Sequence, residues 1–193
     1  MAVGDAQAAF WQAAARDGVV LEKAKVPWIN QRGHYGLPPT AGAAVESLDR
    51  IFHALGGLAP EQQAERVTAL PGDFFHAESG TFIETDELQH FTSFRLTTLD
   101  LYPDHAALGY DWNHYRALCH ELAPKADRYR AAKPAAGFGP GGRQRQRAYN
   151  DALRDLATPA TGHPPLIRIP LVDADGEGAY RRHRREILSA LFD

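Results

Sequence analysis

The segment GDFFHAESGTFIETDELQHF, residues 72–91, holds the side chains whose types and spacing are best suited to chemistry. It places four carboxylates and two histidines in one short stretch: Asp73, Glu84, Asp86, Glu87, His76 and His90. Phe, Ile and Thr favour strands and AESG is typical of a turn, so we expect a hairpin with strands over about 73–77 and 81–87. Acidic side chains are rarely buried without a partner, so these acids need a compensating charge.

The register of the hairpin decides which acids meet. Side chains alternate along a strand, so Glu84 and Asp86 share a face. A turn centred on Glu78–Ser79 places Asp73 opposite Glu84, whereas a turn centred on Ser79–Gly80 places it opposite Asp86. Either register brings Asp73, Glu84 and Asp86 onto one face, where opposed like charges repel.

A hard divalent cation removes that repulsion. Mg²⁺ takes oxygen ligands, usually one or two carboxylates together with water and substrate phosphates, and it can activate water. We therefore expect Asp73, Glu84 and Asp86 to bind Mg²⁺, with Mn²⁺ as its substitute. The alternative is a polar edge hairpin whose acids pair with a basic segment elsewhere in the chain.

Other motifs for metals and nucleotides are absent from the sequence. Glu87-Leu-Gln-His90 is a single ExxH string, whereas carboxylate-bridged di-iron sites need two of them. There is no HExxH motif and no cysteine pair for zinc. The phosphate-binding motifs GxGxxG and GxxxxGK[ST] and the nucleophile motif GxSxG are missing as well.

The elements around the hairpin predict the fold class. Periodicity and end signals predict helices over 5–17, 40–57, 92–102, 111–122, 146–157 and 178–192, and one after Pro60 that carries Val67 and Leu70. Residues 164–173 are expected to form a strand with Ile167, Ile169 and Leu171 on one face, and residues 25–42 and 124–146 to form loops, the second of them mobile. This order predicts an α/β fold, with α+β as the alternative, in which helices flank a small central mixed sheet that carries the acidic hairpin.

Composition limits the class of protein. The 193 residues suit one domain, and no apolar run is long enough to cross a membrane. The first residues lack the pattern of a signal peptide and Cys119 is the only cysteine, so we expect a cytoplasmic protein. The net charge of −3 hides two blocks: residues 73–104 hold seven acids and one base, and residues 125–147 hold seven bases and one acid.

The hairpin resembles the active-site hairpin of the PD-(D/E)XK nuclease superfamily, with Asp73 in PGD and Glu84 and Asp86 in FIETDELQH. The ordered motifs IETDELQHF, AYNDALRDL, PLIRIPLVD and YRRHRREILSAL resemble the branch of very-short-patch-repair-like endonucleases. This similarity covers about residues 73–91 and 147–192. It implies a restriction-endonuclease-like core in a single nuclease-like domain over residues 1–193, with a helical and loop extension over 1–42 and a basic insertion over about 92–142.

The resemblance also implies roles for residues. The protein would hydrolyse DNA phosphodiester bonds as a Mg²⁺-dependent endonuclease, with Asp73 and Glu84 as ligands. Asp86 departs from the family, which usually has lysine at that position. His90 would act as general base or steady the phosphate, and Gln89 would orient the water. Glu46 matches a loosely placed helix acid. The expected contacts to DNA are Arg143, Arg145, Arg147 and Arg154, whereas Asp155 and Arg168 match mainly architectural positions.

Two other functions remain open at this point. The missing lysine favours a catalytically inactive nuclease-fold module that binds DNA or a protein partner. A third interpretation keeps the metal and changes the substrate to RNA or a small phosphoester. The superfamily also includes nucleases that cut as homodimers, so a homodimer is a further expectation.

Overall fold

The computed structural model describes residues 4–192, which form a mixed α/β fold with two small sheets. The helices in this range are α1 (Asp5–Arg16), α2 (Gly42–Ala54), α3 (Ala59–Gln63), α4 (Ser93–Asp100), α5 (Trp112–Ala126), α6 (Arg143–Ala160) and α7 (Gly176–Phe192). The strands are β1 (Lys25–Asn30), β2 (Ala69–Pro71), β3 (Phe74–His76), β4 (Thr81–Glu87) and β5 (Ile167–Leu171). The predicted fold class is therefore confirmed.

The central sheet is mixed and has the order β3-β4-β5. Strands β3 and β4 form the expected antiparallel hairpin, while β5 pairs with β4 in parallel. Phe74 pairs with Ile83, so the next position outward sets Asp73 opposite Glu84. This is the first of the two registers considered from the sequence.

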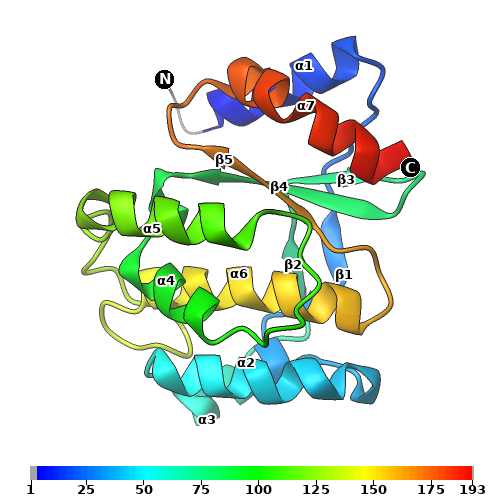
Figure 1. Ribbon diagram of the computed structural model, residues 1–193. Coiled ribbons are helices and arrows are strands. Elements are labelled where there is room, and N and C mark those ends of the chain that lie inside the picture. Colours follow the sequence, from blue (N-terminus) through cyan, green and yellow to red (C-terminus); the bar gives the residue numbers. More distant parts are fainter. Residues whose placement is uncertain (1–3, 193) are drawn as a thin grey trace.

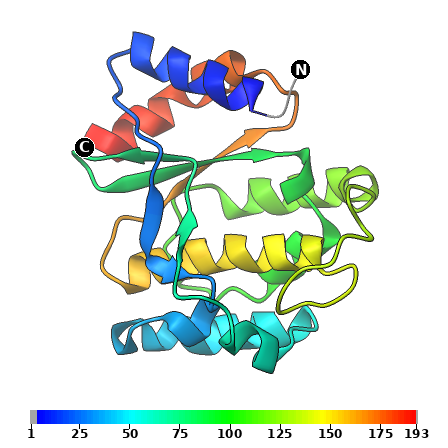
Figure 2. The ribbon, with the colours of Figure 1, turned by 180° about the vertical axis from the view of Figure 1, so that it is seen from behind.

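Helices cover both faces of the central sheet (Figure 1, and from behind in Figure 2). Helices α1 and α7 lie together on one face, and α6 lies across the other with α4 and α5 beside it. Ile167, Ile169 and Leu171 of β5 join Phe10 of α1 and Tyr180 of α7 in one buried cluster. The shared face predicted for these three strand residues is confirmed, and it leaves the other face of the strand for polar contacts with α6.

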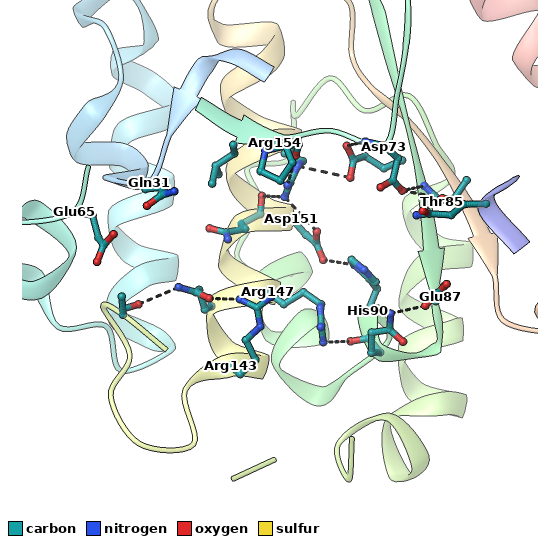
Figure 3. Close-up of a pocket in the computed structure, with 18 of the residues that line it drawn as sticks. Gln31, Glu65, Asp73, Thr85, Glu87, His90, Arg143, Arg147, Asp151 and Arg154 are labelled. Carbon is teal, nitrogen blue, oxygen red and sulfur yellow. Dashed lines mark hydrogen bonds and ion pairs between the residues drawn. The ribbon is translucent and has the colours of Figure 1, made fainter. Parts of the chain in front are cut away.

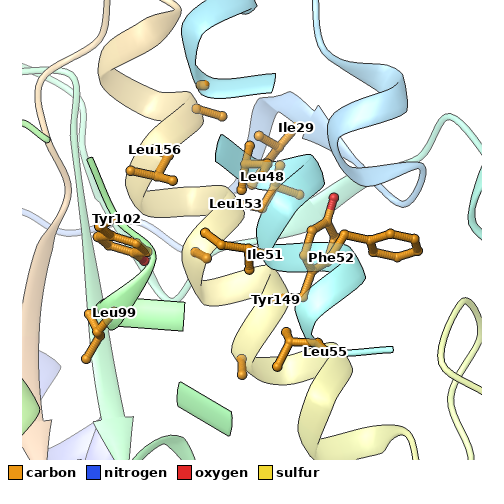
Figure 4. Packing of buried hydrophobic residues seen from close by; sticks show 14 of the residues in the cluster. Ile29, Leu48, Ile51, Phe52, Leu55, Leu99, Tyr102, Tyr149, Leu153 and Leu156 are labelled. Atoms are coloured by element: carbon orange, nitrogen blue, oxygen red, sulfur yellow. The ribbon is translucent and has the colours of Figure 1, made fainter. Parts of the chain in front are cut away.

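A second apolar cluster fixes α6 from its far side. Leu48, Ile51 and Phe52 of α2 pack against Tyr149 and Leu153 of α6 (Figure 4). All five side chains are fully buried. Truncating a buried phenylalanine such as Phe52 to alanine costs about 3–5 kcal/mol, so this packing holds α6 firmly in place.

The segment 25–42 departs from its prediction as a loop. Residues 25–30 form β1, which pairs antiparallel with β2 in a separate two-stranded sheet. Pro27 suggested a loop, but its missing N–H is tolerated on an edge strand, and the register shifts between Val26 and Asn30 at that position. The helix predicted after Pro60 ends at Gln63, and Leu70 lies in β2 instead.

The two helices predicted within the basic insertion are present as α4 and α5, and α5 continues to Ala126. Residues 143–146, which the sequence placed in a mobile loop, form the first turn of α6 instead. The amide of Gln144 donates to the carbonyls of Ala126, Asp127 and Tyr129 and so ties the turns after α5 to α6.

Within residues 4–192, none of the helices combines the length and apolar character that a bilayer crossing needs.

Candidate active site

A cleft of about 590 Å³ lies over α6 and collects most of the predicted site residues (Figure 3). Its floor is the face of α6 that carries Arg143, Arg147, Asp151 and Arg154, which recur at helical spacing. One wall comes from the hairpin and the turn after β4, and the opposite wall from the turn after β1 and from α3. The cleft therefore joins segments that are far apart in the sequence.

Asp73 and Glu84 form the acidic part of the hairpin wall. Oδ2 of Asp73 accepts hydrogen bonds from the backbone N–H of Thr85 at 2.9 Å and from its hydroxyl at 2.8 Å. Oε1 of Glu84 accepts from the backbone N–H of Asp73 at 3.2 Å. Within residues 4–192, Oδ1 of Asp73 and Oε2 of Glu84 accept no hydrogen bond. Each acid is thus held by hydrogen bonding through one oxygen, and Oε2 of Glu84 also forms an ion pair with Arg154.

The environment of Glu84 opposes its charge. The pKa of Glu84 is raised to about 7, because burial and the neighbouring Asp73 carboxylate raise it by more than the Arg154 guanidinium lowers it. Only 5% of the residue is exposed. A buried carboxylate beside a second one is stabilised by a bound cation, so this pair suits a metal ion.

Arg154 lies beside Glu84 at the end of the cleft. Its Nη2 donates to the carbonyl of Pro71 at 2.7 Å and its Nη1 to that of Asn150 at 3.1 Å. The Nε group is buried without a hydrogen-bond partner and lies 3.6 Å from Oε2 of Glu84. Nε and Oε2 of Glu84 therefore form an ion pair without a hydrogen bond, and the guanidinium places positive charge at this end of the cleft.

His90 and Asp151 form a hydrogen-bonded pair. The short 3-10 turn Leu88–His90 follows β4 and directs the imidazole toward α6. Nδ1 of His90 lies 2.9 Å from Oδ2 of Asp151 and 3.3 Å from Oδ1 of Asp86. Because both neighbours are carboxylates, Nδ1 carries a proton. The ring lines the cleft and is about one-fifth exposed, which leaves Nε2 as its reactive atom.

The charges around this pair favour the imidazolium. Burial lowers the pKa of His90, but the carboxylates of Asp151 and Asp86 outweigh it, so the net pKa is raised. Burial alone raises the pKa of Asp151, yet His90 and Arg168 hold it well below its usual range. An ionised Asp151 beside a protonated His90 is therefore the favoured state.

Asp86 does not join Asp73 and Glu84. Both of its carboxylate oxygens accept from Nη1 of Arg168, at 3.0 and 2.9 Å, and the hydroxyl of Tyr115 donates to it at 3.1 Å. Asp86 is 1% exposed and does not line the cleft. The three carboxylates expected to bind one ion are thus separated, because Arg168 already compensates the charge of Asp86.

Among the residues that the structure describes, the group of three or more candidate metal ligands is Asp86, His90 and Asp151, whose ligand atoms lie within 4.8 Å of one another. Nη2 of Arg168 also lies 3.6 Å from Oδ1 of Asp151. A cation there would compete with a fully buried guanidinium that is bonded to Asp86, so the geometry favours a positioning role for this group over a metal site.

A buried network anchors Arg168 from behind. Its Nε donates to Oδ1 of Asp155 at 2.7 Å, and Oδ2 of Asp155 accepts from Arg95, Tyr102 and Tyr110, each at 2.7 Å. These contacts match the architectural role that the resemblance implies for Asp155 and Arg168. They fix the guanidinium that in turn holds Asp86.

The predicted DNA-contacting arginines divide into two groups. Arg143 and Arg147 lie on the cleft floor with Arg154. Arg147 donates to the carbonyl of Gln89 at 3.3 Å, and burial lowers its pKa. Arg145 points away and donates to the carbonyls of Leu55, Phe138 and Pro140.

Two further candidates are placed differently from expectation. Gln89 lines the cleft, but its amide donates to Glu87 at 2.7 Å. Glu46 lines a separate cavity of about 390 Å³ between α2 and the end of α6, so it does not share a site with Asp73 and Glu84.

Sequence reasoning missed Asp151 and Thr85. Asp151 and Arg154 are three positions apart on α6, a spacing that predicts an ion pair, and that pair is present at 3.8 Å. The contact of Asp151 with His90 spans 61 positions, and no spacing rule reveals it. Thr85 supplies two of the bonds to Asp73, and its hydroxyl also accepts from Gln7 of α1 at 3.1 Å.

Comparison with known proteins gives one match. Residues 50–142 match the profile of DUF7255, a family of unknown function. No curated protein and no solved structure matches the chain. The matched segment holds Asp73, Glu84, Asp86 and His90 and ends before α6, so it contains the acidic wall of the cleft without its floor.

Proposed function

We propose that this chain is a metal-dependent endonuclease that hydrolyses DNA phosphodiester bonds. The observation that carries the proposal is the pair of Asp73 and Glu84, which lie opposite each other in the hairpin and open onto a cleft with arginines along its floor. Carboxylates for a cation and guanidinium groups for phosphates, facing one space, suit phosphoryl chemistry better than any other common reaction.

The acidic pair fits Mg²⁺ by the chemistry of its donors. Asp73 and Glu84 each offer a carboxylate oxygen that accepts no hydrogen bond within residues 4–192, and Mg²⁺ prefers oxygen ligands. When bound, the ion would activate water and stabilise charge on the phosphate. Thr85 holds the Asp73 carboxylate in place through two hydrogen bonds, so the pair is positioned before any ligand arrives.

His90 supplies a proton at Nε2. Its raised pKa favours the protonated ring, so between the two roles expected from the sequence the structure supports steadying the phosphate over acting as general base. From the same position the ring can donate a proton to the leaving oxygen. Asp151 holds the imidazole through Nδ1. Asp86 lies near the same nitrogen and is itself bonded to Arg168.

The arginines of α6 bind the nucleic-acid backbone. Arg147 and Arg154 lie on the floor beside His90 and the acids, where their guanidinium groups can bind phosphate oxygens. Contacts of this kind make affinity fall as salt rises.

The inactive binding module is the second candidate. It is favoured by the position where the family usually has lysine, because Asp86 stands there and is neutralised by Arg168. In that case the same cleft binds DNA without hydrolysing it.

One experiment separates the two. Supercoiled plasmid is incubated with the full-length protein in Mn²⁺, in Mg²⁺ and in EDTA, with Glu84→Gln and the exposed α3 control Glu61→Gln. We expect metal-dependent nicking or linearisation that falls by about 10² or more in Glu84→Gln and is unchanged in the control. DNA binding without cutting in either metal would favour the inactive module.

Parallel incubations with RNA and a model diester test the substrate class, and light scattering of the same sample tests the homodimer.

A further inference from the structure

The wall of the cleft opposite Asp73 and Glu84 carries polar side chains. Gln31 and Glu65 lie across α6 from Asp73 and Thr85 (Figure 3), and Asn150 lies on the floor between Arg147 and Arg154. Among the residues that the structure describes, the side chains of Gln31, Glu65 and Asn150 make no hydrogen bond or ion pair. Their donors and acceptors are therefore free for a ligand.

This wall is fixed by its backbone contacts. The buried amide of Gln62 donates to the carbonyl of Gln31. Arg32 donates through Nε to the carbonyl of Glu65 at 2.9 Å, which ties the turn after β1 to the segment after α3. Asn150 is fixed by its place in α6. Free polar side chains on a fixed backbone are well suited to specific recognition.

We propose that Gln31, Glu65 and Asn150 form a subsite for the base of an unpaired nucleotide, which rests on the proposed function of the acidic wall. In a nucleotide the base extends away from the phosphate, so a phosphate held at Arg154 and His90 leaves the base to reach the opposite wall. The side-chain amide of Gln or Asn can form two hydrogen bonds with the edge of adenine, and a carboxylate can accept a hydrogen bond from the amino group of cytosine.

The concave shape selects an unpaired base over a duplex. Proteins that read duplex DNA insert a protruding helix or ribbon into a groove. Here the free side chains line the inside of a cleft of about 590 Å³. Bases can enter such a space, and show all of their edges, when they are unstacked from a single strand or extruded from a duplex. The guanidinium of Arg154, which lines the same cleft and forms an ion pair with Glu84 through Nε, supplies positive charge for an anionic ligand.

Fluorescence anisotropy in EDTA tests the subsite apart from cutting. The full-length protein is titrated with fluorescein-labelled dA12, dC12 and dT12 single strands, a mixed-sequence single strand and its blunt duplex. We expect tighter binding of the single strand than of the duplex, and affinities that differ among the three homopolymers. The largest ratio between the dissociation constants of two homopolymers should fall by at least about fivefold in the double variant Gln31→Ala/Asn150→Ala. This is the low end of the discrimination that one amide with two hydrogen bonds to a base supplies.

The control removes an exposed glutamine and asparagine outside the cleft, Gln12→Ala/Asn113→Ala, and should keep the ratio of the wild-type protein. Equal or tighter binding of the duplex, or an unchanged ratio in Gln31→Ala/Asn150→Ala, would overturn the proposal. If the ratio changes as expected while plasmid is not cut in Mg²⁺ or Mn²⁺, the nuclease proposal fails and the base subsite stands.

Discussion

Nδ1 of His90 lies 2.9 Å from Oδ2 of Asp151, and this single contact joins the turn after β4 to the middle of α6. It sets the orientation of the imidazole and the nitrogen that carries the proton. The contact leaves the imidazole about one-fifth exposed, so the ring still lines the cleft.

Replacing Asp151 by asparagine should impair this pair. The amide keeps the volume but loses the charge that raises the pKa of His90, so that pKa should fall. DNA cleavage should drop by about 10² or more, because the ring loses its orientation and its proton. Plasmid cutting and NMR titration of the His90 ring protons measure the two effects. Asp104→Asn, at an exposed position, serves as control, and an unchanged His90 titration in Asp151→Asn would count against the pair.

Metal binding should appear as thermal stabilisation. Mn²⁺ at about 100 times its Kd should raise the Tm of the wild-type protein by about 5–10 °C, because a ligand of the native state stabilises it by mass action. Glu84→Gln should lose this increase, and in EDTA at pH 8 it should be at least as stable as the wild type, since burial disfavours the charge of Glu84. Calorimetric scans with Mn²⁺ and with EDTA test both points. An equal Mn²⁺ response in Glu84→Gln would place the ion elsewhere.

The local part of the site could be predicted from the sequence. Alternation along the strand and the turn at 77–80 placed Asp73 on the face of Glu84, because hairpin register depends on neighbouring residues, but the sequence left open whether Glu84 or Asp86 lies opposite it. The face shared by Ile167, Ile169 and Leu171 followed from the same alternation. Element type was also correct wherever the periodic pattern was long, as in α2 and α7.

The remaining features depend on long-range packing. Arg168 neutralises Asp86 from 82 positions away, and that contact separates Asp86 from the other two acids. Arg145 was grouped with Arg143 and Arg147 because the segment was expected to be a loop. On a helix the residues at i and i+4 share a face and the one at i+2 points elsewhere, which explains why Arg145 leaves the cleft. The prolines and glycines of residues 25–42 indicated a loop, so β1 was not predicted. Its pairing with β2 is also long-range.

Arg147 and Arg145 should therefore respond differently to the same substitution. Arg147→Gln should weaken DNA binding for all sequences and lower the slope of log K against log salt by about 1, as expected for one lost phosphate contact. Arg145→Gln should keep the slope and lower the free energy of unfolding by about 1–3 kcal/mol, because the carbonyls of Leu55 and Phe138 lose their donor. Binding titrations at several salt concentrations and urea unfolding measure the two effects. A reduced slope in Arg145→Gln and not in Arg147→Gln would contradict the placement.

The network around Asp155 should govern stability in acid. Burial raises the pKa of Asp155, but Arg168 and Arg95 outweigh it and hold that pKa below its usual range. A carboxylate whose pKa is lower in the folded state contributes stability above its unfolded pKa of about 3.9, and the contribution is lost as pH falls through the folded value. Asp155→Asn should therefore lower the free energy of unfolding by about 3–5 kcal/mol at pH 7, since it leaves the buried guanidinium of Arg95 without its counterion and removes one of the carboxylates that balance Arg168.

The difference between the wild type and Asp155→Asn should remain constant between pH 7 and pH 5 and shrink below about pH 4, where the unfolded wild-type chain takes up a proton that the folded chain resists. Other carboxylates titrate in both proteins and cancel in the difference. Urea unfolding of both at pH 7, 5 and 3 measures it. A difference as large at pH 3 as at pH 7 would mean that Asp155 stabilises the fold by hydrogen bonding alone, and the charge of the network would then have no part in holding Arg168 against Asp86.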